Sequence, residues 1–199
     1  MKKTVLFIFI GALMFSCDNP VSRKINEAKE VVSTTTKAVE ELNNMQGDIE
    51  KLQEIEPLTN AELKEWLPEK VRGMKRISFK AGEMSAMKVS SIEAIYANDD
   101  KSKKFKIEVV DGSGHVGASM TAGLRMLFAQ DFEEETEYKI KRTIEKEGVK
   151  IFEEYKKDNS RSLIQLMEEN RFFITATGTN MDIDETWKTL KKFNVDDLD

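Results

Sequence analysis

The residues from Lys103 to Asp111 show the clearest alternation of hydrophobic and polar positions in this chain. Phe105, Ile107 and Val109 fall on one side of the alternation, and charged residues fall on the other. This period of two is typical of a β-strand with one face on a core and the other in water. Comparable alternation predicts six further strands, over residues 76–80, 88–97, 138–144, 149–155, 163–167 and 172–177.

Two segments of the same region have a helical period instead. One runs from residue 118 to 129 and the other from residue 182 to 192. Their predicted inward sides are Met120, Leu124, Leu127 and Phe128 in the first helix, and Ile183, Trp187, Leu190 and Phe193 in the second. Short turns join most of the strands. We therefore expect an α+β fold, an antiparallel sheet of about six to seven strands with two helices packed on one face.

A long stripe of apolar positions precedes this region and predicts an N-terminal helix over residues 22–56. The segment has no proline, and apolar or small side chains recur every three or four residues, apart from the polar Gln46, at Ile25, Ala28, Val32, Thr35, Val39, Leu42 and Ile49. The stripe fits an amphipathic helix that lies on its own domain or acts as a tether. It also fits a coiled coil that joins two copies into a homo-oligomer. Pro57 ends the segment, and Thr59 or Asn60 can cap a short helix through Trp66.

The first 17 residues have the features of an export signal. Two lysines follow Met1, and Val5 to Phe15 is an almost purely apolar run. As a helix this run would cover about 16 Å, roughly half of the ~30 Å hydrocarbon core of a membrane, so it is too short for a span. Cys17, the only cysteine of the chain, follows directly after Ser16.

This arrangement resembles the lipobox of bacterial lipoproteins, in which a small residue precedes a cysteine that is lipidated and becomes the first residue. Ser16 and Cys17 match that pattern, while Met14 and Phe15 differ from its usual leucine and small residue. The resemblance implies that Cys17 carries a diacylglycerol and an N-acyl chain such as palmitate, which together anchor a protein stably. It implies a lipid-anchored protein of the cell envelope, at the outer membrane or facing the periplasm. The expected organisation is a signal peptide (1–16), a lipidated cysteine with a helical spacer (17–60) and the α+β domain (61–199).

Composition narrows the possible partners. The chain has a net charge of −5, with acidic and basic side chains interspersed. No basic patch in the sequence marks a nucleic-acid site, and charge alone does not favour anionic lipid head groups. A single cysteine excludes an internal disulfide, and its lipidation would consume the thiol, which excludes a catalytic cysteine.

One motif suggests cofactor chemistry. Gly112, Gly114 and Gly117 match G-x-G-x-x-G between a predicted strand and a predicted helix. That fingerprint belongs to a parallel βαβ unit, whereas the strands here are predicted to be antiparallel. The three glycines are therefore weak cofactor candidates, and a flexible connection is the simpler interpretation. The one histidine, His115, has no partner signal for a catalytic triad or a metal site. We expect no cofactor, no metal and no catalytic residue, and a protein that is not an enzyme.

Methionine is frequent in the predicted domain, and methionine side chains often line adaptable apolar grooves. A protein that carries an apolar ligand would need a dry cavity of roughly several hundred Å³ between the sheet and its helices.

Several short motifs are spread over residues 67–199. They are Leu67-Pro68 with Val71-x-Gly73, Ala94-x-Tyr96, Val109-x-Asp111, Tyr155 before Ser160-Arg161-Ser162, Arg171-Phe172, and the closing helix from Leu190 to Leu198. Together they resemble a domain of uncharacterised exported proteins and lipoproteins of bacteria, which implies an envelope location and supplies no catalytic residue. The expected function is a non-enzymatic envelope lipoprotein that binds a protein or an envelope component. The alternatives are a carrier or sensor of an apolar, lipid-like ligand, and an enzyme that uses the 112–117 loop.

We expect the mature protein to begin at an acylated Cys17. A mass spectrum of the full-length protein, gently extracted from its own membranes, should show a chain that lacks residues 1–16 and carries added acyl mass. An unmodified Cys17, or a chain that still carries Met1 to Ser16, would contradict the predicted anchor.

Overall fold

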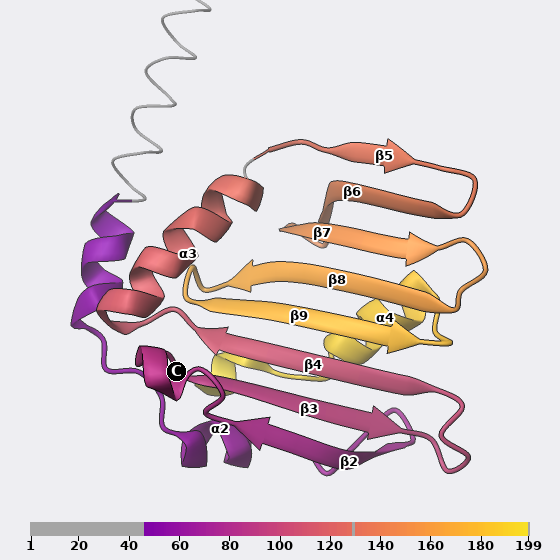
Figure 1. Cartoon of the computed structure of the whole chain (residues 1–199), viewed down its shortest axis with the longest axis horizontal. Helices are drawn as coiled ribbons and strands as arrows, with labels where there is room; N and C mark the ends of the chain where they lie inside the picture. Colours follow the sequence, from indigo (N-terminus) through magenta and orange to yellow (C-terminus); the bar gives the residue numbers. More distant parts are fainter. Residues whose placement is uncertain (1–45, 129, 199) are drawn as a thin grey trace, which may run out of the picture. The chain divides into compact units, whose positions relative to one another are not determined.

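Nine strands form one antiparallel sheet in the computed structural model, which describes residues 46–128 and 130–198 (Figure 1). The strands are β1 (Lys70–Val71), β2 (Met74–Ala81), β3 (Ser91–Ala97), β4 (Lys104–Asp111), β5 (Glu133–Glu135), β6 (Lys139–Lys146), β7 (Val149–Lys156), β8 (Arg161–Glu168) and β9 (Phe172–Thr179). Their order across the sheet is β1-β2-β3-β4-β9-β8-β7-β6-β5. Strands that follow one another in the chain are therefore neighbours in the sheet, except for β4 and β5. The neighbour of β4 is instead β9, the last strand of the chain.

The pairing of β4 with β9 joins two meanders into this sheet. Strands β1 to β4 form the first meander, and β5 to β9 form the second. The two central strands pair from Lys104 opposite Thr179 to Asp111 opposite Phe172. Helix α3 (Gly114–Phe128) carries the chain from the end of β4 toward β5, at the far edge of the sheet (Figure 1).

The predicted α+β class and the antiparallel sheet are confirmed, but the predicted strand count was wrong. The seven predicted strands correspond to β2, β3, β4, β6, β7, β8 and β9. The two missed strands are β1, which has two residues, and β5, which consists of three glutamates. Neither has an apolar alternation. Strand β5 pairs with β6 so that Glu134 lies opposite Lys141, and opposite charges across two strands stabilise such a pairing.

One face of the sheet carries the hydrophobic core. Phe105, Ile107 and Val109 of β4 are buried there, as their alternation predicts. Their β9 neighbours Ile174 and Ala176 are buried on the same face. Three segments cover this core face: α2 (Asn60–Trp66), α4 (Ile183–Leu190) and the 3₁₀ helix η2 (Val195–Leu198). In Figure 1, α4 lies behind the strands.

Local hydrogen bonds define where α2 and α4 begin. The Thr59 hydroxyl accepts from the Glu62 backbone N–H, and the Glu62 carboxylate accepts from the Thr59 N–H at 2.7 Å. This reciprocal capping box satisfies two donors that a helix start otherwise leaves free. At α4, the Asp182 carboxylate accepts from the Glu185 N–H at 2.6 Å. The predicted starts of both helices are thus confirmed.

An aromatic cluster closes the core between α2 and η2. The ring centroid of Phe193 lies 5.5 Å from that of Tyr96 and 5.7 Å from that of Phe105. Tyr96 is fully buried, and its hydroxyl donates to the Pro68 carbonyl at 2.8 Å. Burial raises the pKa of Tyr96 to about 12, so its phenol stays protonated and remains a donor.

Helix α3 contacts the other face of the sheet, so the prediction that both helices pack on one face was wrong. Phe128, in the last turn of α3, contacts Phe173 with ring centroids 6.0 Å apart. Phe173 alternates with the buried core residues Phe172 and Ile174, and it therefore points away from the core. We call this side of the sheet the outer face. The apolar stripe of α3 predicts that the helix packs on an apolar surface. It does not predict which face of the sheet provides that surface.

The helix of residues 46–54 is the described part of the predicted spacer. Its Asp48 accepts from Arg125 of α3 at 3.3 Å, and its Leu52 is buried. The rest of the predicted spacer helix, with its coiled-coil alternative, lies outside the described residues, as do Cys17 and the leader. Within residues 46–128 and 130–198, no helix combines the length and the apolar character that crossing a membrane requires.

A buried ion pair joins the ends of β4 and β9 to the chain that precedes α2. Asp111 Oδ1 accepts from Arg171 Nε at 2.8 Å, and Asp111 Oδ2 accepts from Arg171 Nη2 at 3.0 Å. The same carboxylate accepts from the backbone N–H groups of Leu58, at 2.9 Å, and Ser113, at 3.0 Å. Asp111 is fully buried. These four hydrogen bonds offset the cost of taking the carboxylate out of water.

The protonation of Asp111 links this ion pair to pH. Burial alone would raise the pKa of Asp111, but the hydrogen bonds from Arg171, Leu58 and Ser113 outweigh it and hold the pKa below its usual value. The carboxylate therefore contributes stability above its unfolded pKa of ~3.9, and this contribution is lost as pH falls through the lower folded pKa.

We expect Asp111→Asn to lower the free energy of unfolding at pH 7 by about 3 kcal/mol, because it removes the negative charge that faces Arg171. Urea denaturation of the full chain at several pH values measures this. The gap from wild type should narrow as pH falls below about 4, because the unfolded chain takes up a proton there while the folded Asp111 stays ionised until its lower pKa is reached. The matched variant Asp99→Asn changes a carboxylate that is 89% exposed and should cost less than about 1 kcal/mol. Equal losses in the two variants would contradict a structural role for Asp111.

Candidate functional site

The three glycines of the G-x-G-x-x-G match allow close packing at the start of α3. Gly114 is the first residue of the helix, has a φ of +70°, and donates its N–H to the Ile55 carbonyl at 3.1 Å. A Cβ on Gly117 would lie 2.8 Å from the carbonyl carbon of Gly112, so the first turn of α3 touches the end of β4. The predicted loop over 112–117 was therefore partly wrong, because the helix begins at Gly114 and not at Ala118.

The surroundings of these glycines differ from a dinucleotide site. Strand β4 is antiparallel to both of its neighbours, and β5, which follows α3, is antiparallel to β6. The fingerprint requires a parallel βαβ unit. A Cβ on Gly114 would also lie 3.1 Å from Pro57, so the protein's own chain occupies the space in front of the helix start.

The structure does not bring together the histidine and the serines of this segment that could form a catalytic or metal site. His115 is exposed, and the Ser119 hydroxyl donates to its backbone carbonyl at 2.8 Å and not to its ring. Ser113 is buried, and within the described residues its hydroxyl has no hydrogen-bond partner. In the same part of the chain, no three His, Cys, Asp or Glu side chains are grouped so that they could hold a metal ion.

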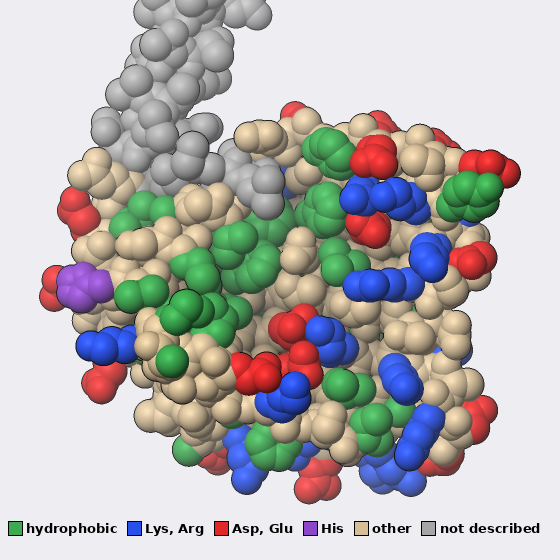
Figure 2. All heavy atoms as spheres, viewed as in Figure 1, with side chains coloured by type: hydrophobic (Ala, Val, Ile, Leu, Met, Phe, Trp, Pro, Cys, Tyr) green, Lys and Arg blue, Asp and Glu red, His purple; other side chains and the backbone are tan. Residues whose placement is uncertain are grey.

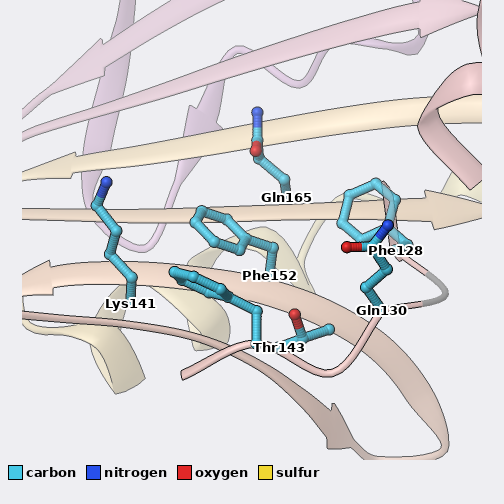
Figure 3. A pocket seen from close by; sticks show the side chains of 7 residues that line it. Phe128, Gln130, Lys141, Thr143, Phe152 and Gln165 are labelled. Atoms are coloured by element: carbon cyan, nitrogen blue, oxygen red, sulfur yellow. The ribbon is translucent and has the colours of Figure 1, made fainter. Parts of the chain in front are cut away.

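An apolar groove lies on the outer face, between the end of α3 and strands β6, β7 and β8 (Figure 3). Its lining residues are Phe128, Gln130, Phe132, Lys141, Thr143, Phe152 and Gln165, and we call it the outer groove. The volume is about 290 Å³. In Figure 3, Phe128 and Gln130 lie at one end and Lys141 lies at the other.

Strand register builds the floor of the outer groove. Thr143 of β6 lies opposite Phe152 of β7, and Phe152 lies opposite Gln165 of β8. Their chain neighbours Ile151 and Ile164 belong to the core, so the floor residues point to the outer face. The last turn of α3 adds Phe128 as a wall.

Polar side chains lie beside the phenylalanine rings of the outer groove. Gln165 donates to the Thr175 hydroxyl at 3.3 Å, and Lys141 pairs with Glu154 at 3.3 Å. The hydrogen bond to Glu154 raises the pKa of Lys141, so this side chain stays charged. Gln130 and Thr143 add two further polar side chains to the lining. An apolar lining with a few convergent polar groups is typical of binding sites.

Sequence reasoning did not predict the outer groove. Only the alternative of an apolar-ligand carrier placed methionines around a cavity between the sheet and its helices. Met74 and Met181 instead lie in the core, and phenylalanines line the groove. A signal was present in the strands. Phe152 and Phe173 occupy positions that alternate with core residues, on the side where a polar residue is expected. Such exceptions indicate a second apolar surface.

We expect the same substitution to have opposite effects at two glycines of α3. Gly117→Ala should lower the free energy of unfolding by about 1–3 kcal/mol, because its Cβ would press on the backbone of Gly112. Gly123→Ala should raise it by about 0.5–1 kcal/mol, because nothing lies within 4 Å of the added Cβ and alanine favours a helix. Urea denaturation measures both values. A stabilising Gly117→Ala would show that α3 does not pack on β4 as described.

Comparison with known proteins adds no relative to this picture. No protein-family model, curated protein or solved structure matches the chain. The resemblance of residues 67–199 to an exported bacterial domain therefore stays an expectation. The function proposed below rests on the sequence and on the geometry of the described residues.

Proposed function

We propose that this protein is a lipid-anchored lipoprotein of the cell envelope, not an enzyme, whose domain binds a protein or an envelope component through the outer groove. The observation that carries the proposal is the outer groove itself. Phe128, Phe132 and Phe152 line a hollow on a sheet face that elsewhere carries mainly polar and charged side chains. Apolar side chains left on a soluble surface in this way are typical of an interaction site.

The sequence supports the anchor, and the fold supports a tether that ends on the domain. The Ser16-Cys17 pattern after a short apolar run is the basis for the lipid anchor. The helix of residues 46–54 is held by Asp48, whose carboxylate accepts from Arg125 at 3.3 Å and from Asn170 at 3.4 Å. The spacer therefore joins the domain beside α3, the helix whose last turn forms one wall of the outer groove.

The size of the outer groove limits what can enter it. A pocket that encloses a whole small molecule typically measures ~300–1,000 Å³. The outer groove measures about 290 Å³ and is open to solvent. It therefore suits one part of a larger partner, such as an apolar side chain or the end of an apolar chain.

A carrier or sensor of an apolar, lipid-like ligand is the second candidate. The three phenylalanine rings of the outer groove favour it, because they supply apolar contact and only a few polar groups. The two candidates differ in the mass of the bound partner, which is that of a protein or an envelope component in the first and that of a small lipid in the second.

We expect native mass spectra of the full-length protein, gently extracted from its own membranes, to show a bound partner. In Thr143→Trp the indole would fill the outer groove, and the added mass should disappear. The matched variant Ser78→Trp places the same side chain on an exposed position of β2 and should keep the partner. A partner that both variants retain, or no partner in the wild type, would contradict binding through the outer groove.

A further inference from the structure

A row of cations crosses the outer face at the end opposite α3. Its members lie at the same end of four strands, and we call them the cation row: Lys139 (β6), Lys156 (β7), Arg161 (β8) and Lys104 (β4), with β9 between the last two. Lys139 lies directly opposite Lys156. Arg161 and Lys104 both lie opposite Thr179 of β9. Figure 2 shows Lys and Arg side chains gathered toward this end, and hydrophobic side chains gathered beside α3.

The cation row is a costly arrangement for the folded protein. Like charges directly opposite each other on paired strands are destabilising. Lys139 has a carboxylate partner, Glu134, at 3.7 Å. Within the described residues, the other three cations have no ion pair, although Asp158 in the turn after β7 interacts electrostatically with Lys156. Two acidic neighbours, Glu134 and Asp158, thus face four cations, so the cation row keeps an excess of positive charge.

Between the cation row and the outer groove, the charges cancel. Lys141 pairs with Glu154 at 3.3 Å. Lys106 pairs with Glu93 at 3.3 Å and with Glu108 at 2.8 Å. Among the described strand residues, the cations of this face that have no ion pair thus lie at the end away from the outer groove.

The spacing between the two features defines the shape of a ligand. Phe152 and Lys156 point to the same side of β7, and four residues of an extended strand span about 13 Å. The outer groove measures about 290 Å³ and is open to solvent, so a long ligand can extend from it along the face toward the cation row. Such a ligand has an apolar end and an anionic end separated by about 13 Å or more.

The position of these features argues against a peptide strand as the ligand. A peptide that adds to a sheet binds through its backbone at a free edge. The outer groove and the cation row lie on the face of β4, β9, β8, β7 and β6, and the edges of the sheet are β1 and β5.

From this geometry we propose that the outer face binds a long-chain fatty acid, with its hydrocarbon end in the outer groove and its carboxylate on the cation row. The proposal rests on the proposed function, because it takes the outer groove as the binding site. The groove excludes the hydrocarbon end from water, and Lys156 and Arg161 supply charge-assisted hydrogen bonds to the carboxylate.

The test uses the full-length protein in nanodiscs of phosphatidylcholine and a palmitic acid that carries a photoreactive diazirine near its methyl end. The matching fatty alcohol serves as the uncharged probe. After illumination, peptide mass spectrometry should place the acid on the residues that line the outer groove. The alcohol should label them about tenfold less, because it makes no ion pair with the cation row. Higher salt should weaken labelling by the acid and leave labelling by the alcohol unchanged.

Two sets of variants test separately how the apolar end and the anionic end of the ligand are bound. Thr143→Trp fills the outer groove and should abolish labelling by both probes. The double variant Lys156→Glu with Arg161→Glu should lower labelling by the acid about tenfold and leave the alcohol unaffected. The control double variant Lys188→Glu with Lys192→Glu changes the same charge at exposed positions in and just after α4, which covers the core face, and should match the wild type. Thermal unfolding confirms that each variant is folded.

The outcomes distinguish this inference from the proposed function. Equal labelling by acid and alcohol that only Thr143→Trp removes would overturn the fatty acid and leave the outer groove as a binding site. A protein partner in the native mass spectra together with an unlabelled groove would also overturn the fatty acid and would keep the proposed function. An unlabelled groove together with native spectra that show no partner would overturn both.

Discussion

The buried carboxylate of Asp111 fixes the geometry on which the rest of this domain depends. Its four hydrogen bonds reach β9 through Arg171, the start of α3 through Ser113, and the chain before α2 through Leu58. The Arg171 carbonyl in turn accepts from the Gly112 N–H at 2.9 Å. The direction in which α3 leaves β4 is thereby set, and with it the position of Phe128 over the outer face. The wall of the outer groove thus depends on an ion pair at the opposite end of the helix.

The strands with a strong alternation could be predicted from the sequence. When one face of a strand is buried, every second residue is hydrophobic, and this pattern is visible in the sequence. Capping signals likewise predicted that α2 begins at Thr59 or Asn60, and the structure has Thr59 as the cap. The face that α3 contacts could not be predicted, because an apolar stripe fits any apolar surface. Asp111 and Arg171 both stand in motifs noted in the sequence, but they are 60 residues apart and only the β4–β9 register makes them partners.

Net charge also proved a poor guide to the electrostatics of the outer face. The chain is acidic overall, and its cations are spread along the sequence among acidic residues. Antiparallel register sorts them differently. It places Lys139 opposite Lys156, while it pairs Lys141 with Glu154 two positions away. A local excess of positive charge of this kind arises because paired strands bring together cations that are far apart in the sequence. A short segment of sequence therefore does not reveal it.

The central pairing of β4 with β9 has a consequence for how the chain folds. The first meander ends on β4, whose partner strand lies more than sixty residues later. Contacts of such long sequence separation form slowly, because the entropy of closing the loop is lost before the contact is gained. Until β9 arrives, β4 is an open edge that can pair with strands of other molecules. A chain that ends before β9, through truncation or interrupted synthesis, would therefore expose an edge prone to aggregation at the centre of its intended sheet.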